Sequence, residues 1–484
     1  MRQSVLIVAM LAAGVLSACS STAPNQTAGQ DVGHQVLSAN DGWAAEGTGT
    51  TGGAKASAGN VFTVSSRKEL VAALTKAGSA PKIIYVKGTI NLATDDSGRE
   101  LFEKDFADPA YSFEAYKKAY DPTVWNRQTL IKGKPPAVSG ALEDARERSS
   151  ANQKKVILIN VPSNTTLVGL GKDAKIVKGN LMLPKGVDNI IIRNIAFEDA
   201  FDYFPTWDAG DSYSTKRTEP VIEADGVNYT IPGCQEKFES DDKGPHRCNG
   251  GRWNSEYDSI SVKGATHVWI DHCSFSDGER LDKMFPPVFA APYNQPSQKV
   301  QHHDGAVDVT DGSDFVTLSF NKFFNHDKTN LIGGSDGMTT DAGKLNVTFH
   351  HNFFEHVKQR QPRVRYGKVH VYNNLYAGSR AWEQKYPFSE SIGLGKEAKV
   401  LSQNNAYELD ADVTADQLPK LFTAGAAMVD SGTLLNGKLV DIVAVFNAKN
   451  AKQQISTNIG WAPKLTPSAD VPAYVKANAG PGKL

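Results

Sequence analysis

The chain has 484 residues, and its 52 Lys and Arg nearly balance its 53 Asp and Glu, giving a formal net charge of −1. Hydrophobic residues make up 40% of the chain and charged residues 22%, as is typical of globular proteins. The near-zero charge argues against a general nucleic-acid binder, because such proteins carry a strong basic excess. With 42 Gly and 23 Pro, the sequence predicts many turns and few long helices.

The N-terminus has the pattern of an export signal. An uninterrupted apolar run, Val5 to Leu16, is too short to span a bilayer as a mature helix. It ends in Leu-Ser-Ala-Cys, which resembles the lipobox of bacterial lipoproteins. That resemblance implies a signal peptide over residues 1–18 and a lipid-modified Cys19. The alternative is cleavage by ordinary signal peptidase, with Cys19 incidental.

The segment after Cys19 has the composition of a linker. Residues 19–60 are rich in Ser, Thr, Ala and Gly, so we expect a flexible tether there and one folded domain over 61–484. Ser20 resembles the residues that permit sorting to the outer membrane. We therefore expect an outer-membrane lipoprotein that faces the periplasm or the surface, or else a secreted protein.

Three cysteines remain besides Cys19. Cys234 and Cys248 lie 14 residues apart in a loop-like stretch, and in an exported protein they are the expected disulfide. Cys273 lies in an apolar, strand-like run and is expected to be a buried free thiol. No two cysteines have close ligand spacing, so cysteine ligation of a metal has little support.

A repeated strand-and-turn unit begins near Lys154. Short runs of β-branched and aromatic residues recur between Gly, Asn and Asp, and none leaves room for a crossover helix. An asparagine follows four of these runs at spacings of 31, 22 and 31: Asn321, Asn352, Asn374 and Asn405. This repeat predicts a solenoid, in which stacked turns of a parallel β-helix let asparagine amides form a ladder. A β-sandwich or propeller with chance asparagines is the alternative.

Two segments interrupt the repeat. Residues 101–153 are polar, charged and partly helix-like, and residues 205–254 are loop-like and carry the cysteine pair. Both are expected to be insertions on one face, where solenoids tolerate them. Residues 418–484 lose the strand rhythm and are expected to pack back along the coil as a cap.

One acidic group stands out. It comprises Glu256 and Asp258, followed by Asp304 and Asp308 in QHHDGAVDVTDGSD. Gathered carboxylates suit a hard cation such as calcium. However, residues four apart in an ideal strand lie about 13 Å apart, so the chain would have to bend, as Gly305 permits. Spacing alone favours solvated turn residues and leaves a metal site open.

A basic group follows later in the chain. Five cations lie in VKQRQPRVRYGKVH without an intervening acid: Lys358, Arg360, Arg363, Arg365 and Lys368. Arginine forks match carboxylates and phosphates, so a polyuronate or polyphosphate ligand is one interpretation. A solubilising surface face is the other. Lys328, in NHDKTNLIGGSD, does not by itself indicate a function.

Taken together, these groups lie in motifs that resemble polysaccharide lyase family 1, the pectate lyases, over roughly residues 61–484. The stretches are NTTLVGLG, DSISVKGATHVWIDHCSFSDG, HHDGAVDVTDGSDFVTLSFNKFFNHDKTNLIGGSD, VTFHHNFFEHVKQRQPRVRYGKVHVYNNLY and GWAPKLTPSADVPAYVKANAGPGKL. The resemblance implies an all-β fold: a right-handed parallel β-helix, the single-stranded pectin-lyase-like solenoid, with loop insertions and a C-terminal cap.

The resemblance also implies a metal site. Asp258, Asp304 and Asp308 match the family's Ca²⁺-binding carboxylates. Glu256 falls where some members have a further acidic ligand, and the position of Asp304 is a glutamate in some members. Pectin lyases lack the full acidic set and act on methyl-esterified polymer without calcium. The acidic set therefore favours demethylated pectate.

For the basic residues, the resemblance implies catalysis. Arg360 matches the proton-abstracting base, Lys328 and Arg365 match residues that bind substrate carboxylates, and Arg363 is expected to bind substrate beside them. The implied reaction is β-elimination in α-1,4-galacturonan (polygalacturonate), giving 4,5-unsaturated oligogalacturonides. Because arginine is charged at ordinary pH, such a base predicts an alkaline pH optimum.

Two other functions are compatible with a β-helix but have less support in the sequence. A hydrolase of the polygalacturonase type would need an acid–base pair of carboxylates, and none of that family's motifs is present. A non-catalytic, lipid-anchored glycan binder would be expected to lack Arg360 or Lys328, and both are present. We expect a monomeric enzyme with polygalacturonate as its partner, no nucleic acid, and membrane contact through the lipid anchor alone.

Overall fold

The computed structural model describes residues 31–125, 136–212, 214–216, 221–224, 227–230, 247–291, 293–294, 298–381, 383, 386–423, 425–444 and 461–484. The predicted signal peptide, Cys19 and Cys234 lie outside the described residues. Lipidation and the disulfide to Cys248 therefore stay predictions.

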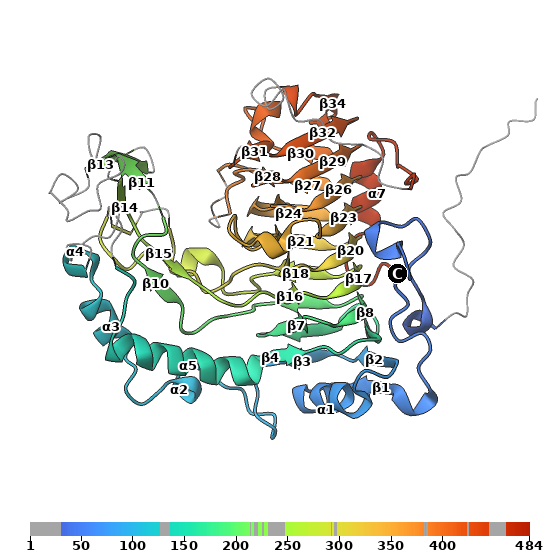
Figure 1. Cartoon of the computed structure of the whole chain (residues 1–484), viewed down its shortest axis with the longest axis horizontal. Coiled ribbons are helices and arrows are strands. Elements are labelled where there is room, and N and C mark those ends of the chain that lie inside the picture. Colours follow the sequence, from blue (N-terminus) through green and yellow to red (C-terminus); the bar gives the residue numbers. More distant parts are fainter. Residues whose placement is uncertain are drawn as a thin grey trace, which may run out of the picture.

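The chain coils into stacked turns that form three long sheets (Figure 1). One turn, for example, passes from β16 (Ile260–Lys263) to β17 (Thr266–Asp271) and then to β18 (Ser274–Ser276), each in a different sheet. Neighbouring turns pair in parallel, with Ile260 opposite Val307 of the next turn. Such connections are right-handed almost without exception. The fold is the predicted right-handed parallel β-helix.

Each sheet takes one strand from each turn. In spatial order, sheet 1 contains β31 (Pro419–Leu421), β28 (Ile392–Leu394), β25 (Arg363–Val364), β22 (Leu331–Ile332), β19 (Val307–Thr310), β16, β7 (Asn180–Pro184) and β4 (Leu158–Asn160). Sheet 2 contains β1 (Val61–Val64), β2 (Lys82–Val86), β5 (Thr165–Gly169), β8 (Asp188–Arg193), β17, β20 (Asp314–Ser319), β23 (Asn346–His350), β26 (Lys368–Tyr372), β29 (Lys399–Gln403) and β32 (Ala427–Ser431). Sheet 3 contains β3 (Thr89–Asn91), β6 (Lys175–Val177), β9 (Ala196–Glu198), β18, β21 (Lys322–Lys328), β24 (Phe353–Gln359), β27 (Leu375–Ala377), β30 (Ala406–Glu408), β33 (Leu434–Leu435) and β34 (Lys438–Leu439).

The recurrent asparagines form the predicted ladder inside the coil. Asn321 Nδ2 donates to Asn352 Oδ1 (3.1 Å), Asn352 to Asn374 (2.9 Å) and Asn374 to Asn405 (3.1 Å). All four are fully buried. Because each amide accepts from one neighbour and donates to the next, these polar groups are satisfied without water.

Aromatic rings stack on successive turns beside the ladder. Phe275, Phe323 and Phe354 follow one another at centroid distances of 5.0 and 4.9 Å, nearly parallel. The repeat therefore places large apolar rings in register along the axis. Cys273 lies next to this stack as a fully buried free thiol, as predicted.

Helices lie at the N-terminal end of the coil and along its side, and most of them belong to a lateral projection (Figure 1). They are α1 (Arg67–Ala77), α2 (Glu103–Phe106), α3 (Phe113–Ala119), α4 (Pro122–Trp125), α5 (Ala141–Ile157) and α7 (Val471–Asn478). None of the helices in the described ranges has the length and apolar character needed to cross a membrane.

The projection, which we call the arm, comprises the described residues of 101–157, 201–256 and 278–302 (Figure 1). It contains α2–α5 and the pairs β10 (Thr206–Asp208) with β15 (Arg252–Asn254), β11 (Ser214–Lys216) with β14 (Arg247–Asn249), and β12 (Val221–Ala224) with β13 (Val227–Thr230). All three segments leave the coil after a strand of sheet 3 and return before a strand of sheet 1. The third segment was not foreseen from the sequence.

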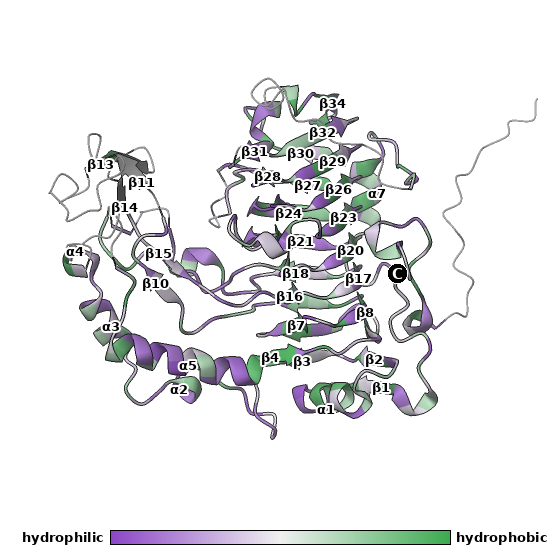
Figure 2. Cartoon of the chain, in the orientation of Figure 1, coloured by the Kyte–Doolittle hydropathy of each residue, from purple (hydrophilic) through white to green (hydrophobic). Residues whose placement is uncertain are grey.

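The arm has a hydrophobic core of its own. Tyr116, Trp207 and Trp253 are fully buried, and Phe289 of the third segment stacks on Trp253 at 5.6 Å. The ion pair of Glu143 and Arg146 is buried on α5 (2.7 Å). In Figure 2 the remaining length of α5 is largely hydrophilic, consistent with a helix at the surface of the arm.

The structure differs from the flexible tether expected up to Asn60. Residues 31–60 form η1 (Val32–His34), η2 (Trp43–Ala45) and η3 (Ala58–Asn60) and lie along sheet 2. The Trp43 and Ala44 amides donate to threonine hydroxyls of the coil at 3.0 Å, and Trp43 meets Trp461 edge to face. The small residues of this segment allow close packing, because a side chain at Gly53 would collide with the Lys82 carbonyl.

The C-terminal region continues the coil before it caps it. β31, β32 and β33 add a further turn within the stretch predicted to have lost the strand rhythm. The chain then runs back along the coil, where Val471 and Val475 of α7 pack against Phe353 and Leu375. The expected cap is therefore the final helical segment.

Candidate active site

The predicted functional residues gather where the chain passes from sheet 3 to sheet 1. Asp304 precedes β19, Lys328 ends β21, and Arg360 follows β24, so the three lie on successive turns. Backbone hydrogen bonds hold these corners together: Ala306 N donates to the Thr329 carbonyl (2.8 Å) and Asn330 N to that of Arg360 (2.9 Å). The arm leaves the coil at the same corner, which places it beside these residues.

Gly305 lets two carboxylates converge. Its amide donates to Asp258 Oδ1 (2.9 Å), and a Cβ atom there would lie 2.7 Å from that oxygen and even closer to Asp308 Oδ1. Asp258 also accepts from Ser261 Oγ (2.7 Å), and Asp308 accepts from the Leu331 amide (2.9 Å). The chain at Gly305 therefore brings the carboxylates of Asp258 and Asp308 together from neighbouring turns, while Asp304 is held by Lys328.

The carboxylates influence one another's ionisation. Burial raises the pKa of Asp258 to about 7, and the charge of Asp304 adds to this. Burial raises the pKa of Asp308 well above its usual value, helped by the charges of both other carboxylates. Burial acts upward on Asp304 too, but Lys328 and Arg360 outweigh it and lower its pKa. Lys328 and Arg360 therefore offset part of the negative charge of the acidic group, chiefly on Asp304.

Lys328 lies against the acidic group. Its buried Nζ is 2.8 Å from Asp304 Oδ1. Burial is the main cause that lowers the pKa of Lys328; the attraction of Asp304 opposes this, and the charges of Arg360 and Arg252 add to it. A buried ammonium between carboxylates and arginines is well placed to meet an anionic ligand.

Arg360 is held by its backbone. It adopts a left-handed conformation (φ 60°), and its carbonyl accepts from Thr329 Oγ1 (2.8 Å) as well as from Asn330 N. Its side-chain Nε is buried without a hydrogen-bond partner among the described residues. The guanidinium is therefore positioned near Asp304 and Asp308 but is not committed to an ion pair within the described chain.

The other two predicted arginines point elsewhere. Arg365 Nε lies 2.9 Å from Asp336 Oδ1, and its Nη1 donates to the Gly333 carbonyl (3.0 Å). The Arg363 guanidinium stacks 3.5 Å above the Phe422 ring. Burial lowers the pKa of Arg363 to about 10, and the charges of Arg365 and Arg360 contribute. Glu256, the weaker ligand candidate, is 46% exposed and lies 3.6 Å from Lys154.

Sequence reasoning missed Arg252. It lies on β15 of the arm, where Asp211 Oδ2 holds its guanidinium at 2.8 Å. Its charge contributes to lowering the pKa of both Asp304 and Lys328. No signal in the sequence ties it to the site, because the arm lies outside the repeat and only the fold brings the two together.

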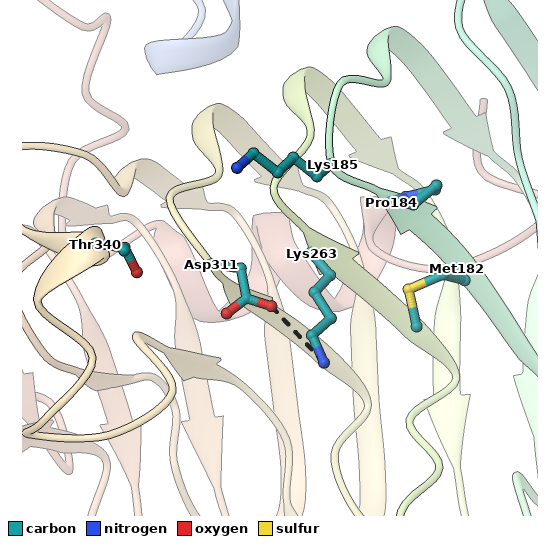
Figure 3. Close-up of a pocket in the computed structure, with 6 residues that line it drawn as sticks. All are labelled: Met182, Pro184, Lys185, Lys263, Asp311 and Thr340. Carbon is teal, nitrogen blue, oxygen red and sulfur yellow. Dashed lines mark ion pairs between the residues drawn. The ribbon is translucent and has the colours of Figure 1, made fainter.

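A groove of about 400 Å³ lies over strands β7 and β16 of sheet 1 (Figure 3). It is lined by Met182, Pro184, Lys185, Lys263, Asp311 and Thr340. None of these is a predicted site residue, and Lys263 and Asp311 lie 3.7 Å apart as an ion pair. Because the groove and the predicted site share no residue, the groove does not replace that site.

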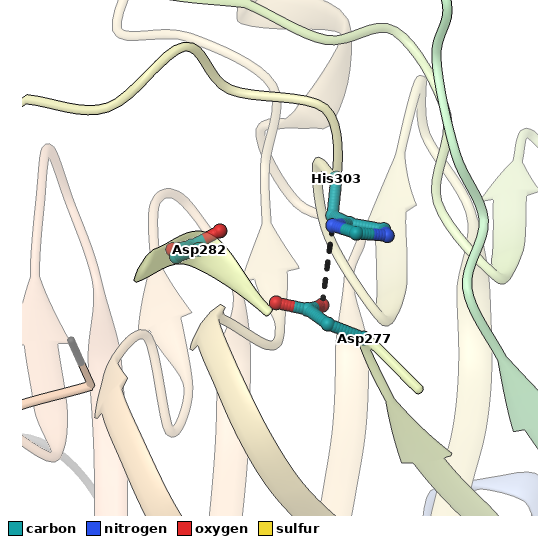
Figure 4. A group of neighbouring side chains, drawn as sticks. All are labelled: Asp277, Asp282 and His303. Atoms are coloured by element: carbon teal, nitrogen blue, oxygen red, sulfur yellow. Dashed lines mark ion pairs between the residues drawn. The ribbon is translucent and has the colours of Figure 1, made fainter. Parts of the chain in front are cut away.

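Among the described residues, one acidic group has ligand atoms that all lie within 4.8 Å of one another, and it is not the predicted triad. It consists of Asp277, Asp282 and His303, all buried (Figure 4). In the triad, by contrast, Asp304 is turned toward Lys328. The buried group adjoins the predicted site, because His303 directly precedes Asp304 in the sequence.

A family model for pectate lyases matches residues 4–118, 135–228 and 245–484. The chain belongs to the pectate lyase family. The predicted family and enzyme class are thereby confirmed, since pectate lyases are polysaccharide lyases.

Individual pectate lyases match over nearly the whole chain. A pectate lyase from Bacillus subtilis is 43% identical over 459 residues, which cover 94% of each chain. Pectate lyase E from Dickeya chrysanthemi is 31% identical, covering 99% of this chain and 94% of its own. The solved pectate lyase from Acidovorax avenae subsp citrulli superposes with a TM-score of 0.80 at 37% identity, covering 98% of this chain and 99% of its own. A pectate lyase bound to a hexasaccharide superposes with a TM-score of 0.77 at 41% identity, covering 94% and 100%.

Proposed function

We propose that the protein cleaves α-1,4-galacturonan by calcium-dependent β-elimination, with Arg360 as the base that removes the proton. The observation that carries this proposal is the meeting of Asp304, Lys328 and Arg360 on three successive turns. A related pectate lyase binds a hexasaccharide, which supports an oligosaccharide as the ligand.

The acidic group fits a hard divalent cation. Asp258, Asp304 and Asp308 would supply carboxylate oxygens, the donor type that calcium prefers. The raised pKa values of Asp258 and Asp308 reflect negative charges crowded in a buried place, which a dication would relieve. Bound there, Ca²⁺ would neutralise charge on the substrate carboxylate.

The remaining residues have separate tasks. The proton on C5 of a uronate is weakly acidic, because its removal adds negative charge beside a carboxylate. The buried ammonium of Lys328 would stabilise that charge. Arg360 would take the C5 proton, and the bond from C4 to its oxygen would break as the double bond between C4 and C5 forms. The departing oxygen would receive a proton from water.

The substrate class follows from charge. Lys328, Arg360 and Arg252 present cations around one corner of the coil. Free uronate carboxylates satisfy these cations, whereas methyl esters do not. We therefore infer a preference for demethylated polygalacturonate over esterified pectin.

The test compares two products on polygalacturonate at alkaline pH. Elimination gives ultraviolet absorbance from the conjugated uronate together with new chain ends, whereas hydrolysis gives chain ends alone. We expect absorbance that grows with added calcium and stops with excess EDTA. Asp308→Asn is expected to raise the calcium concentration for half-maximal rate at least tenfold. Asp311→Asn, which changes a half-buried aspartate three residues further on that pairs with Lys263, should leave it within twofold. Chain ends without absorbance would contradict elimination.

We also propose anchoring through a lipid on Cys19 and a disulfide between Cys234 and Cys248. Both rest on the sequence pattern. The mass of the exported chain tests both: a diacylglycerol and fatty acid on Cys19, and a loss of two hydrogens for the disulfide, are expected. An unmodified Cys19, or a chain cleaved elsewhere, would contradict the anchor.

A further inference from the structure

A buried ion network lies directly behind the candidate site. Lys299 belongs to the third segment of the arm, and its side chain is only 13% exposed. Its Nζ contacts the carboxylates of Asp282 on the arm and of Asp327 on β21. One ammonium therefore connects the arm to the coil.

The network runs along the same three turns as the site. Lys299 precedes Asp304 by five residues, and Asp327 immediately precedes Lys328. Asp327 Oδ1 accepts from Gln359 Nε2 (2.9 Å), and Gln359 immediately precedes Arg360. Gln359 is also the register partner of Lys328 between β21 and β24. The three connected residues Lys299, Asp327 and Gln359 thus each lie close in sequence to one proposed functional residue: Asp304, Lys328 and Arg360, respectively.

The acidic group of Figure 4 belongs to this network and already has its cations. Lys299 lies on Asp282, while His326 pairs with Asp277, which also accepts from Tyr386 Oη (2.7 Å). His303 Nε2 lies 2.9 Å from Asp199, and Arg280 pairs with the same aspartate. A metal ion would have to compete with a lysine that two carboxylates hold, so we read the group as an ion network instead.

We propose that Asp327, paired with Lys299, is a positioning residue, which acts directly on Lys328 and through Gln359 on Arg360 to fix both relative to Asp304. The proposal rests on the proposed function, because it assigns a task to those three residues in elimination. Buried charges are costly to separate, so the ammonium holds its carboxylates in one arrangement. Adjacent backbone atoms then hold Lys328 and Arg360 in theirs.

Two carboxylates on one ammonium provide a matched test. Asp327→Asn and Asp282→Asn each remove one charge from the same lysine, but only Asp327 adjoins the site. We expect Asp327→Asn to lower kcat at least tenfold at saturating calcium and substrate, with KM within threefold. Asp282→Asn should lower Tm by about as much as Asp327→Asn does, but it should leave kcat within twofold of wild type. Gln359→Leu, which keeps all the buried charges, should lower kcat about threefold to tenfold and serves if Asp327→Asn does not fold.

The alternatives give different results. A merely structural network predicts equal losses of Tm and unchanged kcat for both aspartate variants and for Gln359→Leu, which would overturn the proposal. Stoichiometric transition metal in the purified protein, lost in His303→Ala, would also overturn it, because the group would then hold a metal. A wild-type protein that forms no unsaturated product would instead refute the proposed function.

Discussion

The Nζ atom of Lys328 lies 2.8 Å from Oδ1 of Asp304, although the two residues belong to different turns of the coil. The pair joins a proposed substrate-binding cation to a proposed metal ligand. Asp304 pairs with the Lys328 ammonium and would also bind the metal ion. The proposed substrate and metal sites are therefore adjacent at this contact. Lys328 is therefore the residue at which loss of charge should matter most for substrate.

Replacing Lys328 with Ala should lower kcat/KM by about 10²–10³, the usual effect of removing one preorganised group that stabilises developing charge. Steady-state rates on polygalacturonate measure this. Lys322→Ala is the matched control, because Lys322 begins the same strand but pairs with Glu355 (2.8 Å) on the outside. The control should stay within twofold of wild type, and equal losses in both variants would count against the assignment.

Arg252→Ala should raise KM by about fivefold to thirtyfold with a smaller change in kcat, since a cation that contacts substrate contributes chiefly to binding. Arg148→Ala is the control: it also removes an arginine from the arm, one that is exposed and bonded to Asp108 (2.6 Å). Unchanged KM in Arg252→Ala would contradict a contact between Arg252 and the substrate.

Asn352→Ala should destabilise the protein by about 3–5 kcal/mol, because it leaves buried groups without partners. Asn352 accepts from Asn321 N and Nδ2 and donates to the Leu318 carbonyl (2.9 Å) and to Asn374. Chemical denaturation measures the loss. Asn478→Ala, at the exposed end of α7, should cost less than about 0.5 kcal/mol. A small effect in Asn352→Ala would contradict a ladder that carries stability.

Asp202 should make the protein less stable as pH rises. Burial raises its pKa to about 7, with a contribution from Glu256, although the Phe204 and Glu256 amides donate to it. Between its unfolded value of 3.8 and about 7, the unfolded chain loses the proton while the folded chain keeps it, so the free energy of unfolding falls. The decline amounts to roughly 4 kcal/mol at most.

The Asp202→Asn variant isolates this effect, because its amide does not titrate. Wild type should lose stability relative to the variant between pH 4 and pH 8, as denaturation at several pH values would show. A constant difference across that range would contradict the raised pKa.

The coil was predictable because its physics is local and repeated. Alternating apolar residues set the strands, and Asn321, Asn352 and Asn374 recur because each turn needs an amide at the same place. Residues 31–60 were mispredicted as a tether because small residues suit linkers and close packing equally well. Only the structure shows that Trp43 and Gly53 lie against the coil.

The site was predictable in part. Arg360, Lys328 and the aspartates could be placed because they sit within recognisable motifs, and the structure brings Asp258, Asp304 and Asp308 to one corner. Arg252 and Lys299 could not be found, because they belong to insertions without a repeat, and their partners lie far away in the sequence. Their positions depend on how the arm packs on the coil.

The kcat of Arg360→Ala on polygalacturonate, measured beside Arg380→Ala, tests the central claim most directly. Both variants lose one arginine, but Arg380 lies one turn further along the coil, in the loop after β27, where its amide donates to Asp410 (2.7 Å). We predict that Arg360→Ala loses at least about 10³ in kcat, while oligogalacturonate still binds and Arg380→Ala keeps wild-type activity. Retention of more than about a tenth of kcat by Arg360→Ala would show that another group removes the proton.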